Sequence, residues 1–336
     1  MDDRAIGSRD RRGDWAPNAP AETAPLFVFP PRPLALLRWL PHYFLPYNLL
    51  FFLSAIAWWV WIVPPLAVMQ VLSLDWILWL LAVNAVAVAA WYFAFEFPLY
   101  VRRTQGIRFK YNARFPADTS SAVFWFKSQN LENMLRTMLS GVPIWTALQV
   151  LTLWAFANGW GASLIWSENP AALALLCLVV PVIHEFHFYC IHRLIHTPWL
   201  YEWVHAVHHK SINPSPWSSL AMHPVEHLLY FASILYHLVL PSHPLIAIYQ
   251  LHLAGFGAVP GHVGFHKVEI TGRHAVDSHA YIHYLHHKYF RVNFGDGLIP
   301  VDRWFGTFHD GSAASEAAMK ARFRTEITDS SRKMPT

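Results

Sequence analysis

The sequence has little charge and almost no cysteine. Only 14% of its 336 residues are charged and 54% are hydrophobic, whereas a soluble domain carries about 25% charged residues. Both cysteines, Cys177 and Cys190, lie in one apolar stretch, which argues against a disulfide framework and excludes a CxxC metal motif. The composition therefore indicates a membrane protein.

Several common functional motifs are also missing. The chain has no phosphate-binding P-loop, no G-x-S-x-G nucleophile turn and no HPGG element of a fused haem domain. The net charge of +4 is not gathered into a basic stripe with interleaved aromatic residues, so we expect no nucleic-acid partner. Residues 1–25 lack the apolar core of a secretory signal. We expect residues 1–38 to form a disordered cytoplasmic tail.

Lys and Arg are absent from three long stretches, residues 39–101, 137–192 and 211–266. A helix that crosses a membrane needs about 20 mostly apolar residues, so each of the first two stretches has room for two. We place these four spans near residues 46–65, 75–98, 143–166 and 171–191. In the third stretch, Pro241 and Pro244 interrupt the apolar residues 228–256. A further span and a re-entrant or interfacial helix pair both remain open there.

The basic residues predict which side of the membrane each loop faces. They gather in the N-terminal segment and in the loop of residues 102–136, whereas the two predicted hairpin tips, VLSLDW and WSENPA, carry none. The positive-inside rule places the N-terminus, the basic loop and everything after the fourth span in the cytoplasm. We therefore predict an all-α fold, a polytopic helical membrane protein with about four transmembrane helices and a cytoplasmic helical lobe.

Histidine is unusually abundant, with 21 residues. On a helix, residues three and four apart lie on one face, and the chain repeats this spacing in three boxes, one HxxxH and two HxxHH. The boxes are His192 and His196; His205, His208 and His209; and His283, His286 and His287. Further pairs at four-residue spacing are His223 with His227, His262 with His266, and His279 with His283.

Three interpretations of these histidines compete. Single histidines at a membrane boundary cap helices or reach the interface, but that role does not explain repeated boxes. A metal transporter would spread its ligands over several spans, whereas these histidines gather at one cytoplasmic edge. A catalytic metal centre fits the pattern, because imidazole binds iron, copper and zinc. The imidazoles exceed what one ion uses, and carboxylates nearby are few, which favours a two-iron site held by nitrogen.

The surroundings of the boxes carry further motifs. FHFYCIHRLIH, HPVEH and HHKYFRVNFGDGLIPVDRWFGTFHDG, with the order of the boxes, resemble the fatty acid hydroxylase/sterol desaturase superfamily of membrane di-iron oxygenases. The resemblance covers residues 185–311, and HPVEH is similar to an element of the sterol-modifying branch. The chain departs from the family pattern at Glu185, His187, Phe294 and Val301.

The resemblance implies a set of iron ligands. Two iron ions (Fe2+/Fe3+) would be bound by His192, His196, His205, His208, His209, His262, His266, His283, His286 and His287. His262 and His266 are included because related enzymes carry ligands between the second and third boxes. His223, His227 and His279 are either ligands or outer partners of ligands.

The resemblance also implies an activity and partners. O2 would be used to hydroxylate or desaturate a lipid from the bilayer, which is sterol-like, an ether lipid or a fatty acyl chain. Electrons would come from a separate cytochrome b5-, ferredoxin- or rubredoxin-like donor with its reductase. Glu185 and Glu226 would hydrogen-bond ligand imidazoles, and His184 and His187 would line the substrate entrance. A catalytically inactive lipid-binding relative is the remaining alternative.

These interpretations divide the chain into four parts. After the tail, residues 39–170 hold transmembrane helices and the basic loop, residues 171–311 form the catalytic domain, and residues 312–336 form a C-terminal tail.

Overall fold

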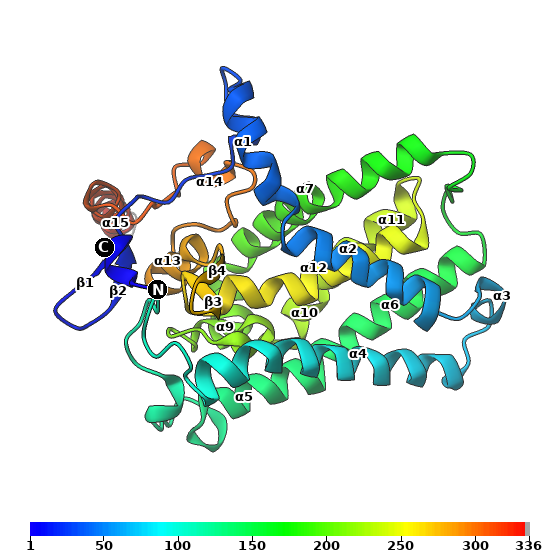
Figure 1. Cartoon of the computed structure of the whole chain (residues 1–336), viewed down its shortest axis with the longest axis horizontal. Helices are drawn as coiled ribbons and strands as arrows, with labels where there is room; N and C mark the ends of the chain where they lie inside the picture. Colours follow the sequence, from blue (N-terminus) through cyan, green and yellow to red (C-terminus); the bar gives the residue numbers. More distant parts are fainter. Residues whose placement is uncertain (333–336) are drawn as a thin grey trace.

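The computed structural model of the chain describes residues 1–332, which are mostly helical (Figure 1). Long helices run side by side along the longest axis, and shorter elements gather at one end around α13 (Tyr281–Tyr289). The strands of the described residues form two small antiparallel hairpins, β1 (Gly7–Arg9) with β2 (Trp15–Pro17) and β3 (Lys267–Thr271) with β4 (His274–Asp277). The predicted all-α class is confirmed.

Within residues 1–332, three stretches of helix are long and apolar enough to cross a membrane, and a fourth depends on a bend. The three are Leu74–Val101 (α4, Leu74–Glu96, and η4, Phe97–Val101), Gln129–Ala157 (α5, Gln129–Arg136; η7, Thr137–Gly141; α6, Val142–Ala157) and Pro170–Ile195 (α7). The fourth joins α1 (Pro33–Phe44) to Tyr47–Ile62 (α2, Tyr47–Ala57, and η3, Trp58–Ile62) across a bend of 42°. A polytopic helical membrane protein with about four spans is thus confirmed.

The helix Gln129–Ala157 begins earlier than the span predicted at residues 143–166. Its first turns are polar, and the side chain of Ser128 caps them by accepting a hydrogen bond from the Leu131 amide. Gln129 and Glu132 in these turns are buried against protein. Hydropathy alone therefore misses this part of the helix, since its polar residues face other side chains and not solvent.

A buried polar network joins the helices inside the bundle. Asn84 of α4 donates to Thr146 Oγ1 at 3.0 Å and to Gln149 Oε1 at 2.8 Å, both on α6. Its own Oδ1 accepts from the indole N–H of Trp58 at 3.2 Å. In a membrane, burial of apolar surface between helices supplies little driving force because lipid is equally apolar. Hydrogen bonds between helices therefore help to hold the bundle together.

Helix α12 (Pro244–His262) is the centre of the bundle, surrounded by α2, α4, α6 and α7. Nearly all its side chains are buried. At Gly255 the packing is so close that a Cβ would lie 1.9 Å from the indole of Trp145. This explains why the part of the apolar stretch that lies in α12, residues 244–256, has no outward apolar face to present to lipid.

The third Lys/Arg-free stretch folds as a helical hairpin. One arm consists of α10 (Pro224–Phe231), η10 (Ala232–Leu235) and α11 (Tyr236–Val239), and α12 forms the other. At its tip Ser242 pairs with the loop between α6 and α7, donating to Ala162 O at 2.9 Å and accepting from the Leu164 amide at 2.8 Å. The hairpin therefore reaches from the α13 end of the bundle to the opposite end.

The N-terminal segment differs from the expected disordered tail, because it packs on the lobe. Trp15 is only 2% exposed, lies edge-on to Phe109, and its amide donates to Tyr111 O. Farther along, the Ala24 amide donates to Gly297 O at 2.8 Å. A buried indole gives this otherwise polar segment enough apolar contact to be ordered.

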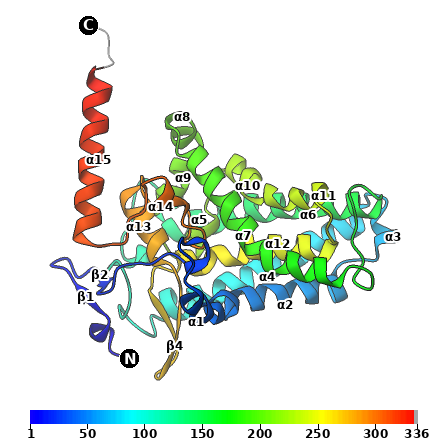
Figure 2. The same cartoon turned by 90° about the horizontal axis from the view of Figure 1, so that it is seen from above.

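Short elements connect the larger ones. They are η1 (Asp3–Ala5), η2 (Pro25–Phe27), α3 (Leu66–Met69), η5 (Pro116–Asp118), η6 (Trp125–Lys127), α8 (Pro198–Leu200), η8 (Tyr201–His205), α9 (Ala206–His209), η9 (Pro216–Leu220) and α14 (Val301–Trp304). Within the predicted C-terminal tail, α15 (Ala313–Arg332) stands away from the bundle (Figure 2). Residues 333–336 lie outside the described part.

Candidate metal centre

Histidines from four segments meet at one end of the bundle. His192 and His196 come from the end of α7, and the second box comes from η8 and α9. His262 is the last residue of α12, and the third box lies on α13. Because each box keeps helical spacing, its imidazoles point from one face of its helix toward the others.

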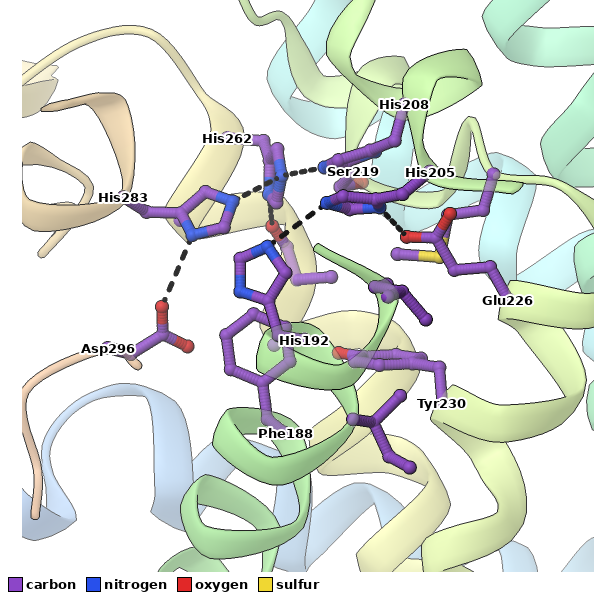
Figure 3. Close-up of a pocket in the computed structure, with 16 residues that line it drawn as sticks. Phe188, His192, His205, His208, Ser219, Glu226, Tyr230, His262, His283 and Asp296 are labelled. Carbon is purple, nitrogen blue, oxygen red and sulfur yellow. Dashed lines mark hydrogen bonds and ion pairs between the residues drawn. The ribbon is translucent and has the colours of Figure 1, made fainter. Parts of the chain in front are cut away.

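Among the described residues, nine imidazoles form two adjacent groups. Figure 3 shows His192 and His205 of one group beside His208, His262 and His283 of the other. One group consists of His192, His196, His205, His209 and His286, and the other of His208, His262, His283 and His287. In each group one ligand atom per residue lies within 4.8 Å of all the others. Eight of the nine side chains are buried, and His196 is partly exposed.

The Nε2 atoms approach one another closely in both groups. Those of His196, His209 and His286 form a triangle with sides of 3.1, 3.2 and 3.0 Å. In the other group, His262 Nε2 lies 3.2 Å from His208 Nε2 and 2.9 Å from His283 Nε2. Two imidazole nitrogens bound at about 2.1 Å to one ion are separated by similar distances.

Backbone carbonyls fix the tautomer of three of these imidazoles. Nδ1 lies 2.7 Å from Phe294 O in His192, 2.7 Å from Val292 O in His286 and 2.8 Å from Ala258 O in His262. A carbonyl only accepts, so Nδ1 carries the proton and Nε2 presents a lone pair to its neighbours. Lone pairs that converge in a buried site need a cation, and the residues therefore fit a metal ion.

Buried ring nitrogens without a hydrogen-bond partner are a second, independent sign that these residues fit a metal ion. Among the described residues, Nδ1 of His208 and Nδ1 of His209 are buried without a hydrogen bond, and so are both ring nitrogens of His287. A buried polar atom without a partner is costly. Ligation of a metal ion by His287 would remove one such cost.

The electrostatic environment keeps these imidazoles neutral. Burial, followed by the neighbouring histidines, lowers the pKa of His208, His209, His286 and His287 well below the usual 6.5. The same two causes lower the pKa of the partly exposed His196 to about 2. Metal ions bind the neutral form of imidazole, so the site holds its histidines in the ligating state at neutral pH.

A carboxylate orients a fourth imidazole. Glu226 of α10 is buried, and its Oε1 lies 2.7 Å from Nδ1 of His205. The Nε2 of His205 then faces Nε2 of His192 at 3.2 Å. Carboxylate partners of this kind fix the ring orientation of metal-binding histidines.

Comparison with known proteins places this arrangement in a family. Residues 177–307, which carry all three boxes, match the family described as Fatty acid hydroxylase. These residues belong to the fatty acid hydroxylase/sterol desaturase superfamily. The resemblance seen in the sequence is thereby confirmed.

The curated relatives of this chain are sterol enzymes by name. A Delta(7)-sterol 5(6)-desaturase of Gibberella zeae is 34% identical over 54% of this chain and 57% of its own length. Another of Aspergillus fumigatus is 28% identical over 54% of the chain and 64% of its own length. Methylsterol monooxygenase 1 of Gallus gallus is 27% identical over 49% and 57%. The chain thus spans little more than half of these relatives, and no solved structure matches it.

The NFGDG motif, residues 293–297, shapes the loop behind His192. Asp302 accepts hydrogen bonds from the amides of Phe294 at 3.0 Å and Gly295 at 2.8 Å. Glu185 of α7 accepts from the next two amides, of Asp296 at 3.0 Å and Gly297 at 2.9 Å. These two carboxylates hold the Phe294 carbonyl against His192. Glu185 therefore acts on the loop, whereas Glu226 contacts a boxed imidazole directly as expected.

His266 is the one predicted ligand that the structure does not bring to either group. The expected four-residue spacing from His262 requires a continuous helix, but α12 ends at His262 and the chain turns at Gly264, whose φ is +74°. His266 lies instead beside Tyr111, with Nδ1 3.2 Å from the hydroxyl oxygen, and 3.8 Å from Asp277.

The histidines predicted to be either ligands or outer partners of ligands also lie outside both groups. His223 caps α10 by accepting from the Val225 amide, and His227 contacts Ser140 and Leu220 O. His279 is exposed beside Asp277. Of the two histidines expected at the substrate entrance, His184 lines a cleft next to the site, while His187 is bonded to Tyr236 and Leu229 O.

One carboxylate near the site, that of Asp296, is not predicted from the sequence. Asp296 Oδ1 lies 3.5 Å from Nδ1 of His283 (Figure 3). Asp296 follows the third box by nine residues and shares no helix with it, so spacing gives no sign of the contact. The carbonyl acceptors at Val292 and Phe294 are equally invisible, because any residue supplies a backbone carbonyl.

Proposed function

We propose that this protein is a membrane-bound, non-haem di-iron oxidoreductase that uses O2 to hydroxylate or desaturate a lipid in lipid biosynthesis. The pair of adjacent, buried groups of neutral imidazoles carries the proposal. The names of the relatives, sterol desaturases and a methylsterol monooxygenase, support a lipid substrate. Sterol-like lipids, ether lipids and fatty acyl chains are all candidates.

Each imidazole group would hold one iron ion, and bound iron would supply O2 activation and C–H oxidation. The chain itself contributes the rest. The carbonyls of Ala258, Val292 and Phe294 keep the Nδ1 protons in place, and Glu226 does the same for His205. Apolar side chains, among them Phe188 and Met222, line the cavity beside the ligands and exclude water.

The partly exposed His196 supports a route for electrons. It is the member of its group nearest the surface, and the positive charges of Arg193 and Arg291 act on it. An acidic surface on a cytochrome b5-, ferredoxin- or rubredoxin-like donor with its reductase would complement these arginines. The positive-inside pattern supports a cytoplasmic location for this face.

The first experiment is metal analysis of detergent-purified protein reconstituted with ferrous iron. We expect about two iron ions per chain, because two imidazole groups are present. His208→Ala and His286→Ala each remove one ligand from a different group and should lower iron content and abolish product formation. The matched control is His274→Ala, an exposed histidine outside both groups, which should keep the iron of the wild type.

Product formation is then measured as the change in cellular lipids with and without the gene. A lipid lost in the His208→Ala and His286→Ala strains but kept in the His274→Ala strain identifies the product. Stoichiometric iron without any lipid oxidised under reducing conditions would contradict the enzyme. Failure to bind iron under all reconstitution conditions would contradict the di-iron centre itself.

A further inference from the structure

A cleft of about 470 Å3 lies beside the metal centre, outside both imidazole groups. Its walls come from the N-terminal segment of residues 17–24, from α1, from α7 and from the start of α13. Pockets of this size hold small organic ligands. Nothing in the arrangement of the metal ligands requires such a cleft, so its purpose needs a separate explanation.

One face of α7 runs from this cleft to the metal ligands. Pro181, His184 and Glu185 line the cleft, and the residues three and four positions farther on line the cavity at the metal centre. Those later residues are Phe188, Ile191, His192 and Ile195. Helical spacing places all of them on one side of α7, which forms a continuous wall between the two spaces.

Helix α12 provides a second wall. Leu253 lines the cleft, and Gly257 and Gly261, each one helical turn farther along, line the cavity at the metal centre. A Cβ at Gly261 would meet no atom within 4 Å, so open space adjoins it. Asp296 lines both the cleft and the cavity, so this residue stands between the two spaces.

The outer end of the cleft lies against an amphipathic helix. On α1, an apolar stripe is exposed at Leu34, Leu37, Leu40 and Phe44, with fractions between 36% and 65%. Trp39 and Tyr43 of the same helix line the cleft. A helix with one exposed apolar face is suited to the membrane interface. The 42° bend after α1 allows α1 to lie there while Tyr47–Ile62 enters the bundle, and α1 stands at the edge of the bundle in Figure 1. The cleft thus opens where the bilayer surface would be.

The charges of the cleft define which lipid end it accepts. Among the described residues that line it, none is Lys or Arg, whereas four are carboxylic acids: Glu22, Glu185, Asp277 and Asp296. Asp277 lies 3.8 Å from His266 and 3.5 Å from His279, which gives the wall hydrogen-bonding groups. An anionic lipid end would be repelled here, while an uncharged donor or acceptor would find partners.

We propose that this cleft is the lipid entry site, which binds the uncharged, hydroxyl-bearing end of a lipid while the apolar remainder extends along α7 and α12 toward the metal centre. The inference rests on the proposed function of that centre for its meaning. It also gives a role to His266, which lines the cleft and does not join either imidazole group. Its test needs no turnover.

The test is photolabelling of the full chain in phosphatidylcholine nanodiscs, with and without iron. The probes are a long-chain fatty alcohol and its sulfate ester, each carrying a diazirine either near the head or near the tail. Cross-linked residues are located by mass spectrometry. We expect head-labelled alcohol on residues 17–24 and 39–48, tail-labelled alcohol on residues 188–195, and at least about tenfold less cleft labelling by the sulfate.

Two charge-reversal variants make the test specific. Glu22→Lys changes an exposed residue at the cleft and should raise labelling by the sulfate there. Glu168→Lys changes an exposed residue in the loop between α6 and α7 and should leave labelling unchanged. Equal cleft labelling by both probes, or labelling confined to the lipid-facing helices, would overturn the proposal. Cleft labelling in protein that binds no iron would instead contradict only the di-iron function.

Discussion

At the scale of single residues, the contact between Glu226 and His205 decides which nitrogen His205 offers to the candidate metal centre. Replacing Glu226 with Ala removes the acceptor of the Nδ1 proton and frees the ring to rotate or change tautomer. Loss of such a partner costs about 10- to 100-fold in metal affinity at characterised sites. We expect Glu226→Ala to lose iron correspondingly faster to a chelator, as measured by the rate of iron release.

Glu226→Gln is the matched control for this prediction. The amide oxygen of Gln still accepts from Nδ1–H at the same position, so iron retention should fall much less than in Glu226→Ala. Equal losses in both variants would show that the negative charge of Glu226, and not its role as an acceptor, stabilises the site.

Lys110 is a second residue whose environment has a measurable consequence. It is 0% exposed, and its Nζ lies over the rings of Tyr100, Phe115 and Phe265. Burial lowers its pKa from 10.5 to about 7. Between these values the unfolded chain binds more protons than the folded one, so the free energy of unfolding rises with pH, by at most about 1.4 kcal/mol per unit.

We therefore expect the wild-type protein to be more stable at pH 9 than at pH 7 in denaturant or thermal unfolding. Lys110→Met, which keeps the length of the side chain without its charge, should raise stability at pH 7 and reduce this rise. Lys127→Met, at an exposed lysine, should leave the pH dependence unchanged. Identical pH profiles of Lys110→Met and wild type would refute the assignment to Lys110.

At the scale of elements, the fold depends on how closely α12 approaches its neighbours. A Cβ at Gly255 would lie 1.9 Å from Trp145, an indole that is fully buried and cannot move aside without displacing α6. Overpacking of this kind costs about 1–3 kcal/mol. Gly255→Ala should accordingly lower the midpoint of thermal unfolding in detergent.

The same helix supplies the control. Gly261 has open space where its Cβ would lie, and Ala favours a helix over Gly by up to about 1 kcal/mol. Gly261→Ala should therefore leave the unfolding midpoint unchanged or raise it. A midpoint of Gly255→Ala equal to that of the wild type would show that α12 and α6 can separate without cost.

Elements also explain how far the sequence predicts the site. His192, His208 and His286 are recognisable because helical spacing survives wherever a box lies on a helix. Helical spacing wrongly predicts His266 as a ligand, because no residue near it in the sequence indicates that α12 ends at His262 before the turn at Gly264. Asp296 reaches His283 through a loop shaped by Asp302 and Glu185, and such a contact depends on tertiary structure alone.

At the scale of the whole molecule, the distribution of Lys and Arg predicts most of the membrane architecture. The gaps at residues 39–101 and 137–192 contain most of each helix that is long and apolar enough to cross, although Gln129–Ala157 begins before its gap and Pro170–Ile195 ends after it. The third gap does not predict a membrane span correctly. Helix α12 within it is apolar because it is buried among other helices, and not because it contacts lipid. Composition also wrongly predicts that the N-terminal segment is disordered. Burial of the Trp15 indole orders this segment although most of its other residues are polar.

The orientation of the molecule leads to the last prediction. The positive-inside rule places the metal-centre end in the cytoplasm and the loop between α6 and α7 on the opposite side. Ala314→Cys and Ser167→Cys, each in a Cys177→Ser/Cys190→Ser background, put one exposed thiol at either end. In sealed right-side-out vesicles, an impermeant maleimide should label the thiol at position 167 at once and the thiol at 314 only after permeabilisation. The reverse order would place the imidazole groups outside, away from cytosolic reductant, and would contradict the proposed route of electrons to His196.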